Sequence, residues 1–281
     1  MNSPLEHASV PAATLAANFE YVPVPAFEDN YIWAVSDGRH AVVVDPGDAA
    51  PVRAYLAKRG WQLAAILLTH HHNDHVGGVA DLLSDERVPV YGPAGEALGP
   101  LDRFVTRVKG GNAVHLGAPA LDFKVMDVPG HTRGHIAYFQ ASDRSGKPHL
   151  FCGDTLFACG CGRLFEGSPA QMLASLDSFA ALPGSTEVHC AHEYTLSNIR
   201  FALACDPDNT DLRDWSRAAA ALRERGEPTL PTTIAHERAV NPFLRAGDPA
   251  VQATLAESLH EAVPDRLAAF TLMREWKNRF R

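Results

Sequence analysis

The segment "THHHNDHVGG", residues 69–78, constrains this chain more than any other, because it places four histidines and an aspartate within seven consecutive positions. Crowding that many titratable groups together without a partner is costly in free energy. His70 and His72 would lie on the same side of an extended segment, whereas Asp74 and His75 follow where the chain turns into a helix. One loop could therefore supply ligands to two adjacent metal ions.

Three more candidate ligands follow apolar runs that are typical of strands: His131 in "VPGHT", Asp154 in "FCGDT" and His192 in "CAHEY". Loops at the ends of strands commonly present functional side chains. Imidazoles and carboxylates without thiolates suit zinc, iron or manganese, and this set is richer than one structural site needs. We expect two divalent ions, zinc ahead of iron or manganese, with Asp154 bridging them and a shared hydroxide as the nucleophile.

The other histidines and the cysteines give weaker signals. We expect that His71 is not a ligand. We expect packing or hydrogen-bonding roles for His135, His149 and His189, and the pattern indicates no role for His115, His236 and His260. The five cysteines, which include no CxxC pair, are Cys152, Cys159, Cys161, Cys190 and Cys205. They resemble neither a disulfide framework nor a thiolate zinc site, so a reducing compartment is the simpler inference.

Composition limits the classes of function. With a formal net charge of -8 over 281 residues, the chain lacks the broad basic field that nucleic-acid binding needs. The first 20 residues carry two acids, no Lys or Arg and no continuous apolar run, unlike a signal or transit peptide. No stretch reaches the roughly 18 consecutive apolar residues of a membrane span. We expect a soluble, cytoplasmic monomer that binds a small molecule, with residues 1–18 as a loose tail.

Short β-type runs alternate with turns from Tyr21 to about His192. Helices are expected at Ala49–Arg59, at Val76–Leu83 and in the segment that Ser168 can cap. Many strands with a few helices between them predict stacked sheets covered by helices.

Beyond about residue 193 the spacing of apolar residues becomes helical, as in "LRDWSRAAAALRERG" and "PAVQATLAESLHEAV". Gly226 and Pro264 are the expected stops of these two helices. The chain as a whole is therefore predicted to be an α+β protein in which a smaller α-helical domain follows the sheets.

The motif "THHHNDH", followed by single His, Asp and His ligands in that order, resembles the metallo-β-lactamase superfamily. That resemblance implies an αββα sandwich with a metal site. The superfamily includes lactamases, nucleases, lactonases, thioesterases and oxygenases, and a shared fold does not choose among them.

Four further segments are similar to the glyoxalase II (hydroxyacylglutathione hydrolase) family: "GDTLFACGCGRLFEGS", "AHEYT", "NPFLR" and "LMREWKNRF". The similarity runs from about Phe19 to the C-terminus. It implies a catalytic domain at residues 19–192 and a helical substrate-binding domain at residues 193–281. It also implies a thioesterase that hydrolyses S-D-lactoylglutathione to D-lactate and glutathione, the second step of methylglyoxal detoxification.

The resemblance also implies a role for each ligand. It assigns His70, His72 and His131 to a first metal, and Asp74, His75 and His192 to a second. Asp154 would bridge the two, and Asp74 and Asp154 would be the catalytic carboxylates.

Five matched positions are implied to bind the substrate: Arg163, Phe165, Tyr194, Arg274 and Lys277. Phe165 stands where some members have a tyrosine, so one hydroxyl donor is missing here. The segment "REWKNRFR" has four cations and one acid in an otherwise acidic chain, which suits the carboxylates of glutathione.

Other functions compete with this one. A persulfide dioxygenase of the same superfamily would hold a single iron through two His and one Asp. A β-lactamase or lactonase would need no clamp for glutathione carboxylates, and a nuclease would need a positive surface. A non-enzymatic metal-binding protein is the remaining alternative.

Overall fold

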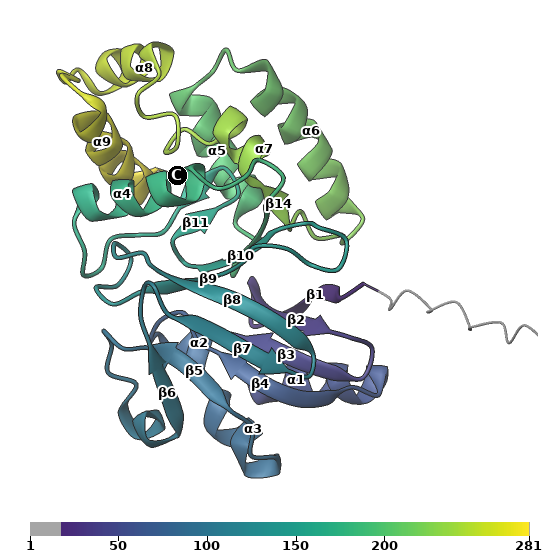
Figure 1. The fold of residues 1–281 in the computed structure, drawn as a ribbon. Coiled ribbons are helices and arrows are strands. Elements are labelled where there is room, and N and C mark those ends of the chain that lie inside the picture. The colour runs from purple at the N-terminus through teal and green to yellow at the C-terminus, as the bar shows by residue number, and fades with distance from the viewer. Residues whose placement is uncertain (1–17, 281) are drawn as a thin grey trace, which may run out of the picture.

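The computed structural model describes residues 18–280, so the tail predicted at 1–18 lies, except for its last residue, outside the described part. Two six-stranded sheets face each other and helices cover their outer sides (Figure 1). The first sheet contains, in spatial order, β1 (Glu20–Ala26), β2 (Asn30–Ser36), β3 (His40–Val44), β4 (Gln62–Leu67), β5 (Val90–Pro93) and β6 (Val105–Val108). The second contains β14 (Thr232–Thr233), β13 (Glu187–Cys190), β10 (His149–Gly153), β9 (Ile136–Gln140), β8 (Ala120–Asp127) and β7 (Ala113–Gly117).

Connections along the chain explain the mixed direction of the strands. β1, β2 and β3 pair antiparallel through short turns. β3, β4, β5 and β6 are parallel, because longer crossovers that include α1 (Ala49–Arg59) and α3 (Val79–Asp85) return the chain to the same edge. In the second sheet β10 pairs parallel with β13, so their carboxyl ends meet at one edge.

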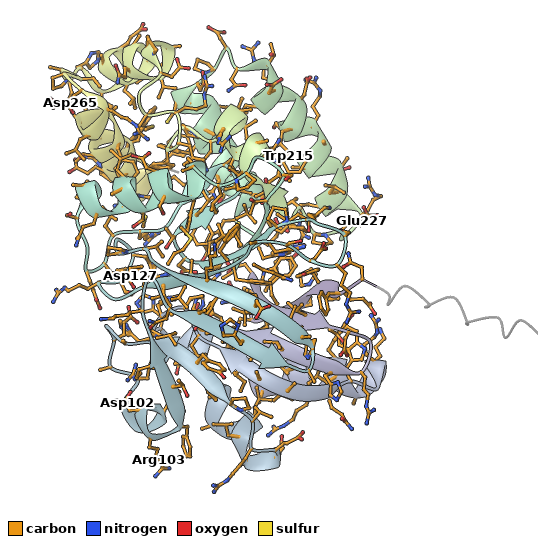
Figure 2. All side chains as sticks on the ribbon, viewed as in Figure 1. Asp102, Arg103, Asp127, Trp215, Glu227 and Asp265 are labelled. Atoms are coloured by element: carbon orange, nitrogen blue, oxygen red, sulfur yellow. The ribbon has the colours of Figure 1, made fainter. Side chains whose placement is uncertain are left out.

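Side chains of the first sheet alternate between its two faces, and each face packs into a separate hydrophobic cluster. Trp33 and Val42 point toward the second sheet, whereas Ile32 and Val43 point outward against α1 and α3. Side chains fill the space between the layers (Figure 2). A strand that is buried on both faces, such as β2, needs apolar residues at successive positions. The continuous apolar run "YIWAV" therefore predicts a strand.

Helix α4 (Pro169–Ala180) begins as the sequence predicts. The Ser168 hydroxyl accepts from the Gln171 amide, and the Gln171 side chain accepts in return from the Ser168 amide. Leu176 and Phe179 of this helix are buried in the inner core cluster. The predicted helix Ala49–Arg59 is also found with those bounds.

Two helix predictions need correction. The helix expected at Val76–Leu83 is split into α2 (Asn73–Val76) and α3, because the Gly78 amide donates to the Pro46 carbonyl and turns the chain. Helix α8 (Pro249–Leu259) ends before Pro264, because His260 adopts a left-handed conformation.

The C-terminal segment is helical, as expected, and contains α5 (Thr195–Cys205), α6 (Thr210–Glu224), α7 (Ile234–Val240), α8 and α9 (Arg266–Arg279). It packs above the second sheet (Figure 1). Phe201, Phe243 and Phe270 join the same buried cluster as the strands, and β14 adds a short strand to the sheet. The remaining elements are a hairpin of β11 (Leu156–Phe157) and β12 (Gly160–Cys161) and a short 3-10 helix at Gly99–Phe104. The α+β sandwich with a helical C-terminal part is thereby confirmed.

Among residues 18–280, no helix combines the length and the apolar character that crossing a membrane requires.

Candidate metal centre and active site

All seven predicted ligands meet at one edge of the sandwich. The histidine segment follows β4, Asp154 follows β10, His192 follows β13, and His131 lies in the connection from β8 to β9. Three of these strands therefore deliver their ligands from their carboxyl ends. Residues that are more than 100 positions apart in the chain are brought into contact by the fold.

The first group consists of three imidazoles. His72 Nδ1 lies 3.1 Å from His70 Nε2 and 3.0 Å from His131 Nε2. Burial lowers the pKa of all three rings, so they are neutral and present lone pairs. Three neutral imidazole nitrogens at these separations form a ligand set for one divalent ion.

The second group contains two imidazoles and two carboxylates. His75 Nε2 lies 3.4 Å from Asp74 Oδ2 and 3.3 Å from Asp154 Oδ1. His192 Nε2 lies 3.6 Å and 3.3 Å from the same two oxygens. Burial lowers the pKa of His192, but the charge of Asp154 outweighs it and raises that pKa to about 9. The carboxylates thus favour positive charge here, which a cation would supply.

Asp154 faces both groups. Its Oδ2 lies 3.3 Å from His131 Nε2, while Oδ1 faces His75 and His192. Burial opposes its ionisation, but His75 and His192 hold its pKa below the ordinary range. His75 Nε2 and Asp154 Oδ1 are buried and have no hydrogen-bond partner. Such unpartnered atoms are costly unless a ligand completes them, so the donor set fits bound divalent metal.

Contacts behind the ligands were not predicted from the sequence. Asp45 accepts from His75 Nδ1 at 3.0 Å and from the Thr69 hydroxyl at 2.7 Å, and that hydroxyl lies 3.0 Å from His70 Nδ1. His192 Nδ1 donates to Asp29 at 2.8 Å. Such carboxylates fix the tautomer and orientation of metal-binding histidines. Asp45 directly follows the apolar run of β3, so its place at the end of a strand could have indicated a role at this site. Nothing in the sequence marks Asp29.

Two glycines set the backbone of the ligand loops. A side chain at Gly47 would overlap the backbone carbonyl of Asp74, and one at Gly162 would overlap that of Asp154. Both predicted carboxylate ligands therefore sit on backbone that is packed directly against glycine.

A hollow of about 420 Å³ opens over the ligands. Phe165 and Tyr194 line it beside His72, Asp74, His131, Asp154 and His192. Tyr194 stacks on His192 with ring centroids 4.7 Å apart, and burial raises the pKa of its hydroxyl, which stays protonated. Phe165 is 62% exposed and meets the rings of His72 and His131 edge-on.

The predicted cations lie outside the lining of this hollow. Arg163 is exposed, and its carbonyl accepts from His131 Nδ1 at 2.9 Å. Arg274 is only 4% exposed and donates to the Cys161 carbonyl at 2.7 Å. Lys277 donates to the Ser197 carbonyl at 3.0 Å, and burial together with the Arg274 charge lowers its pKa to about 8.

The histidines that were not expected to be ligands have other partners. His71 Nδ1 lies 2.8 Å from Glu96 Oε2, and His135 Nε2 accepts from the Asp154 amide at 3.1 Å. His149 and His189 contact each other at 3.0 Å.

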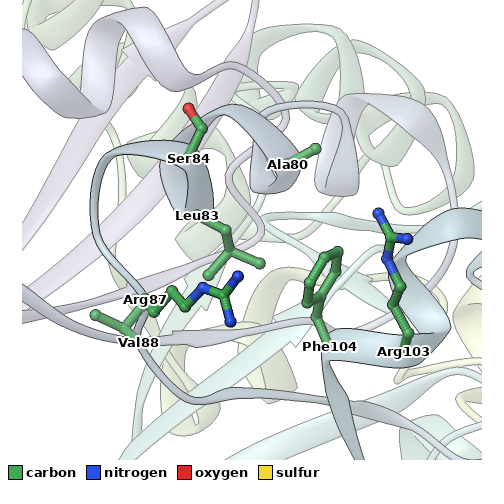
Figure 3. A pocket seen from close by; sticks show the side chains of 7 residues that line it. All are labelled: Ala80, Leu83, Ser84, Arg87, Val88, Arg103 and Phe104. Atoms are coloured by element: carbon green, nitrogen blue, oxygen red, sulfur yellow. The ribbon is translucent and has the colours of Figure 1, made fainter.

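A second hollow, of about 370 Å³, lies on the outer side of the first sheet beside α3 (Figure 3). Its described lining is Ala80, Leu83, Ser84, Arg87, Val88, Arg103 and Phe104. That lining contains no histidine, cysteine or carboxylate, so it offers none of the ligand types that line the first hollow.

Comparison with known proteins first identifies the superfamily to which the chain belongs. Residues 26–192, which hold all seven predicted ligands, match the family model described as "Metallo-beta-lactamase superfamily". A protein called TTHA1623, solved in a di-iron-bound form, is 27% identical with a TM-score of 0.55, over 80% of this chain and 99% of that one. The sandwich and its histidine edge are thus those of this superfamily.

The C-terminal helices narrow the assignment. Residues 193–280 match the model described as "Hydroxyacylglutathione hydrolase C-terminus". A hydroxyacylglutathione hydrolase from Cupriavidus metallidurans is 56% identical over 92% of this chain and 98% of its own length. One from Albidiferax ferrireducens is 54% identical over 93% and 100%, respectively. The chain belongs to the hydroxyacylglutathione hydrolase family within the metallo-beta-lactamase superfamily.

Proposed function

We propose that this protein is a thiolester hydrolase that cleaves S-2-hydroxyacylglutathiones, with S-D-lactoylglutathione as the principal substrate and D-lactate and glutathione as products. It would thereby act in the second step of methylglyoxal degradation. The observation that carries the proposal is the position of Asp154, whose two oxygens face separate groups of imidazoles at the floor of an open hollow. The relatives' name supplies the substrate class.

We further propose how the residues divide the metal sites. His70, His72 and His131 would hold one divalent ion, Asp74, His75 and His192 another, and Asp154 both. When bound, the two ions would lower the pKa of a water that attacks the thioester and would stabilise negative charge on the carbonyl oxygen. Zinc is the proposed ion, with iron and manganese as the alternatives that metal analysis would identify.

The chain's own groups position the water and the substrate. The described contacts of the Asp74 carboxylate involve Oδ2, which leaves Oδ1 to accept a proton from the attacking water. Tyr194 would donate a hydrogen bond from its hydroxyl to the substrate, and Phe165 would pack against the acyl or cysteinyl part, both from the lining of the hollow.

The cations are proposed to bind glutathione. Arg163 is exposed near Tyr194, and Lys277 keeps part of its surface open beside α5. Arg274 is buried against the β11–β12 hairpin, so its proposed contribution to carboxylate binding is combined with holding that hairpin. Residues 19–192 would thus carry the chemistry together with the contacts of Arg163 and Phe165, and residues 193–281 would add the remaining glutathione contacts, in a cytoplasmic monomer.

The direct test measures loss of the S-D-lactoylglutathione thioester by absorbance, with metal content determined on the same sample. Fast hydrolysis with at least two ions per chain is expected. A parallel oxygen-uptake assay with glutathione persulfide tests the dioxygenase alternative. Oxygen uptake with one iron and no hydrolysis would overturn the proposal.

A further inference from the structure

A second cluster of metal-ligating side chains lies at the other end of the two strands that lead to the active site. His149 and Glu187 begin β10 and β13, and they are direct neighbours in the parallel register. Because side chains alternate along a strand, His189 lies on the same face as Glu187. Asp154 and His192 follow the opposite ends of these strands, so the cluster is separate from the centre described above.

Three electron-pair donors converge in this cluster. His149 Nδ1 lies 3.0 Å from His189 Nε2 and 3.4 Å from Glu187 Oε2. Ligand atoms around a tetrahedral zinc ion are about 3.3 Å apart, given zinc–nitrogen distances of about 2.0–2.1 Å. The separations therefore match those around a bound ion, and they also match those of the first imidazole group of the active site.

The surroundings of His149 fix which of its nitrogens carries the proton. His149 Nε2 lies 3.2 Å from Asp143 Oδ2. Burial opposes ionisation of Asp143, but hydrogen bonds from Ser145 and Asn18 hold its pKa below the ordinary range, so this carboxylate accepts the ring proton. His149 Nδ1 then presents a lone pair toward the Glu187 carboxylate. A carboxylate behind a histidine in this way is typical of metal ligands.

Burial and charge also suit a cation. Both rings are 1% exposed, and burial lowers the pKa of each, which favours the neutral form that binds metal. Lys147 pairs with Glu187 Oε1 at 2.7 Å, which leaves Oε2 for the cluster. The Glu187 side chain is 21% exposed, so the cluster borders solvent on the side of this carboxylate.

We propose that His149, Glu187 and His189 form an additional site for a divalent cation of the zinc class, outside the seven-ligand centre. An ion there would tie β10 to β13 and so fix the two strands whose far ends carry Asp154 and His192. Hydrolysis does not depend on this site in the proposal.

The test compares zinc content among three proteins: the wild type, Glu187→Gln and Lys147→Gln. Each is saturated with Zn²⁺, freed of excess ion by gel filtration and measured by plasma mass spectrometry. Glu187→Gln removes a ligand, whereas Lys147→Gln breaks the same ion pair and leaves all three ligands. We expect Glu187→Gln to retain one zinc ion per chain fewer than the other two, with thioester hydrolysis unchanged.

A second variant tests the carboxylate behind the ligand. Asp143→Asn keeps all three ligands and should weaken zinc binding at this site about 10- to 100-fold. Equal zinc content and affinity in all four proteins would overturn the site and leave a proton shared between two imidazoles in its place. Because thioester hydrolysis is assayed on the same samples, that result is distinguishable from failure of the proposed hydrolase activity.

Discussion

At the scale of single residues, two buried aspartates have different positions around the metal centre. Asp154 contacts both groups of imidazoles directly, whereas Asp45 touches the ring of His75 from behind and reaches His70 through Thr69. The sequence marked Asp154 through its place after a strand. It could not mark Asp29, whose contact with His192 spans 163 positions of the chain.

Substitution of these two aspartates should distinguish a metal ligand from a residue that only orients the ligands. Asp154→Asn is expected to abolish measurable hydrolysis and to lower the metal content after gel filtration, because no charged group remains between the two sets of histidines. Asp45→Asn should retain activity at saturating zinc and bind zinc about 10- to 100-fold more weakly. Isothermal titration with zinc and thioester assays would measure both. Equal metal retention in the two variants would contradict the proposed ligand role of Asp154.

Lys277 should make substrate affinity depend on pH. Its pKa is lowered to about 8, first by burial and then by the Arg274 charge, so the ammonium form is lost as pH rises through that value. We expect KM to rise between pH 7 and pH 9 in the wild type. In Lys277→Met, KM should be about 10- to 100-fold higher at pH 7 and should lack this rise, as for loss of a charged hydrogen bond of about 1.5–3 kcal/mol.

Steady-state kinetics at several pH values give the comparison, with Arg274→Ala as the contrasting variant. Loss of the Arg274 contact to the Cys161 carbonyl should lower the Tm as well as raise KM. A KM for Lys277→Met equal to that of the wild type would remove this lysine from the proposed glutathione site.

At the scale of elements, the β11–β12 hairpin depends on polar groups of α7 and the residue after it. Asn241 donates to the carbonyls of Phe157 and Gly160 at 3.2 and 3.0 Å, and Glu237 accepts from the Cys159 amide at 2.8 Å. The sequence marked the segment "NPFLR" without showing this contact. Pairing between segments some 80 positions apart is set by tertiary packing, which local patterns do not encode.

Glu237 should make stability fall as pH rises. Burial raises its pKa to about 7 from an ordinary 4.5, so the folded chain holds this proton more tightly than the unfolded chain. Its contribution is fully present below about pH 4.5 and is lost as pH rises to about 7, by roughly 3 kcal/mol at 1.36 kcal/mol per unit. Glu237→Gln should remove this dependence.

Urea unfolding of the metal-loaded wild type and Glu237→Gln between pH 5 and pH 8 checks this expectation. The difference in unfolding free energy between the two proteins is the informative quantity, because pH effects from the metal ligands are common to both. A difference that stays constant with pH would show that Glu237 does not titrate in this range.

At the scale of the whole molecule, the helical segment and the sheets share one buried core. Phe243 packs between Phe201 and Phe270, with ring centroids 5.9 and 5.6 Å away, in the cluster that also contains Phe151 of β10. The change in hydrophobic period near residue 193 was readable in the sequence. The sequence does not show that the helices and the sheets share one core, because an apolar face does not indicate which element it packs against.

Truncation of Phe243 should therefore destabilise the entire protein. Phe243→Ala is expected to cost about 3–5 kcal/mol, as for other large buried side chains. Near-UV circular dichroism and thioester activity should be lost in one coincident transition in urea. Two separate transitions would mean that the proposed domains at 19–192 and 193–281 unfold independently.

Metal removal should also act on the whole fold. The proposed ligands come from loops attached to both sheets, so ions bound there would stabilise the folded chain in proportion to their affinity. Dipicolinate is expected to abolish hydrolysis and to lower the Tm, and added zinc should restore both. Calorimetry with and without the chelator measures the shift, and an unchanged Tm with lost activity would show that the ions contribute chemistry without stability.

Gly47 and Gly162 have a consequence for how this active site can be mapped or redesigned. Both lie against the backbone of an aspartate that is proposed to bind metal, and a glycine has no side chain with which to touch an ion or substrate. Alanine scanning, which usually reports the value of atoms removed, would here report the damage done by one added methyl group. A mutational library that preserves the seven proposed ligands but varies these two glycines would therefore lose the site, although every proposed ligand remained in place.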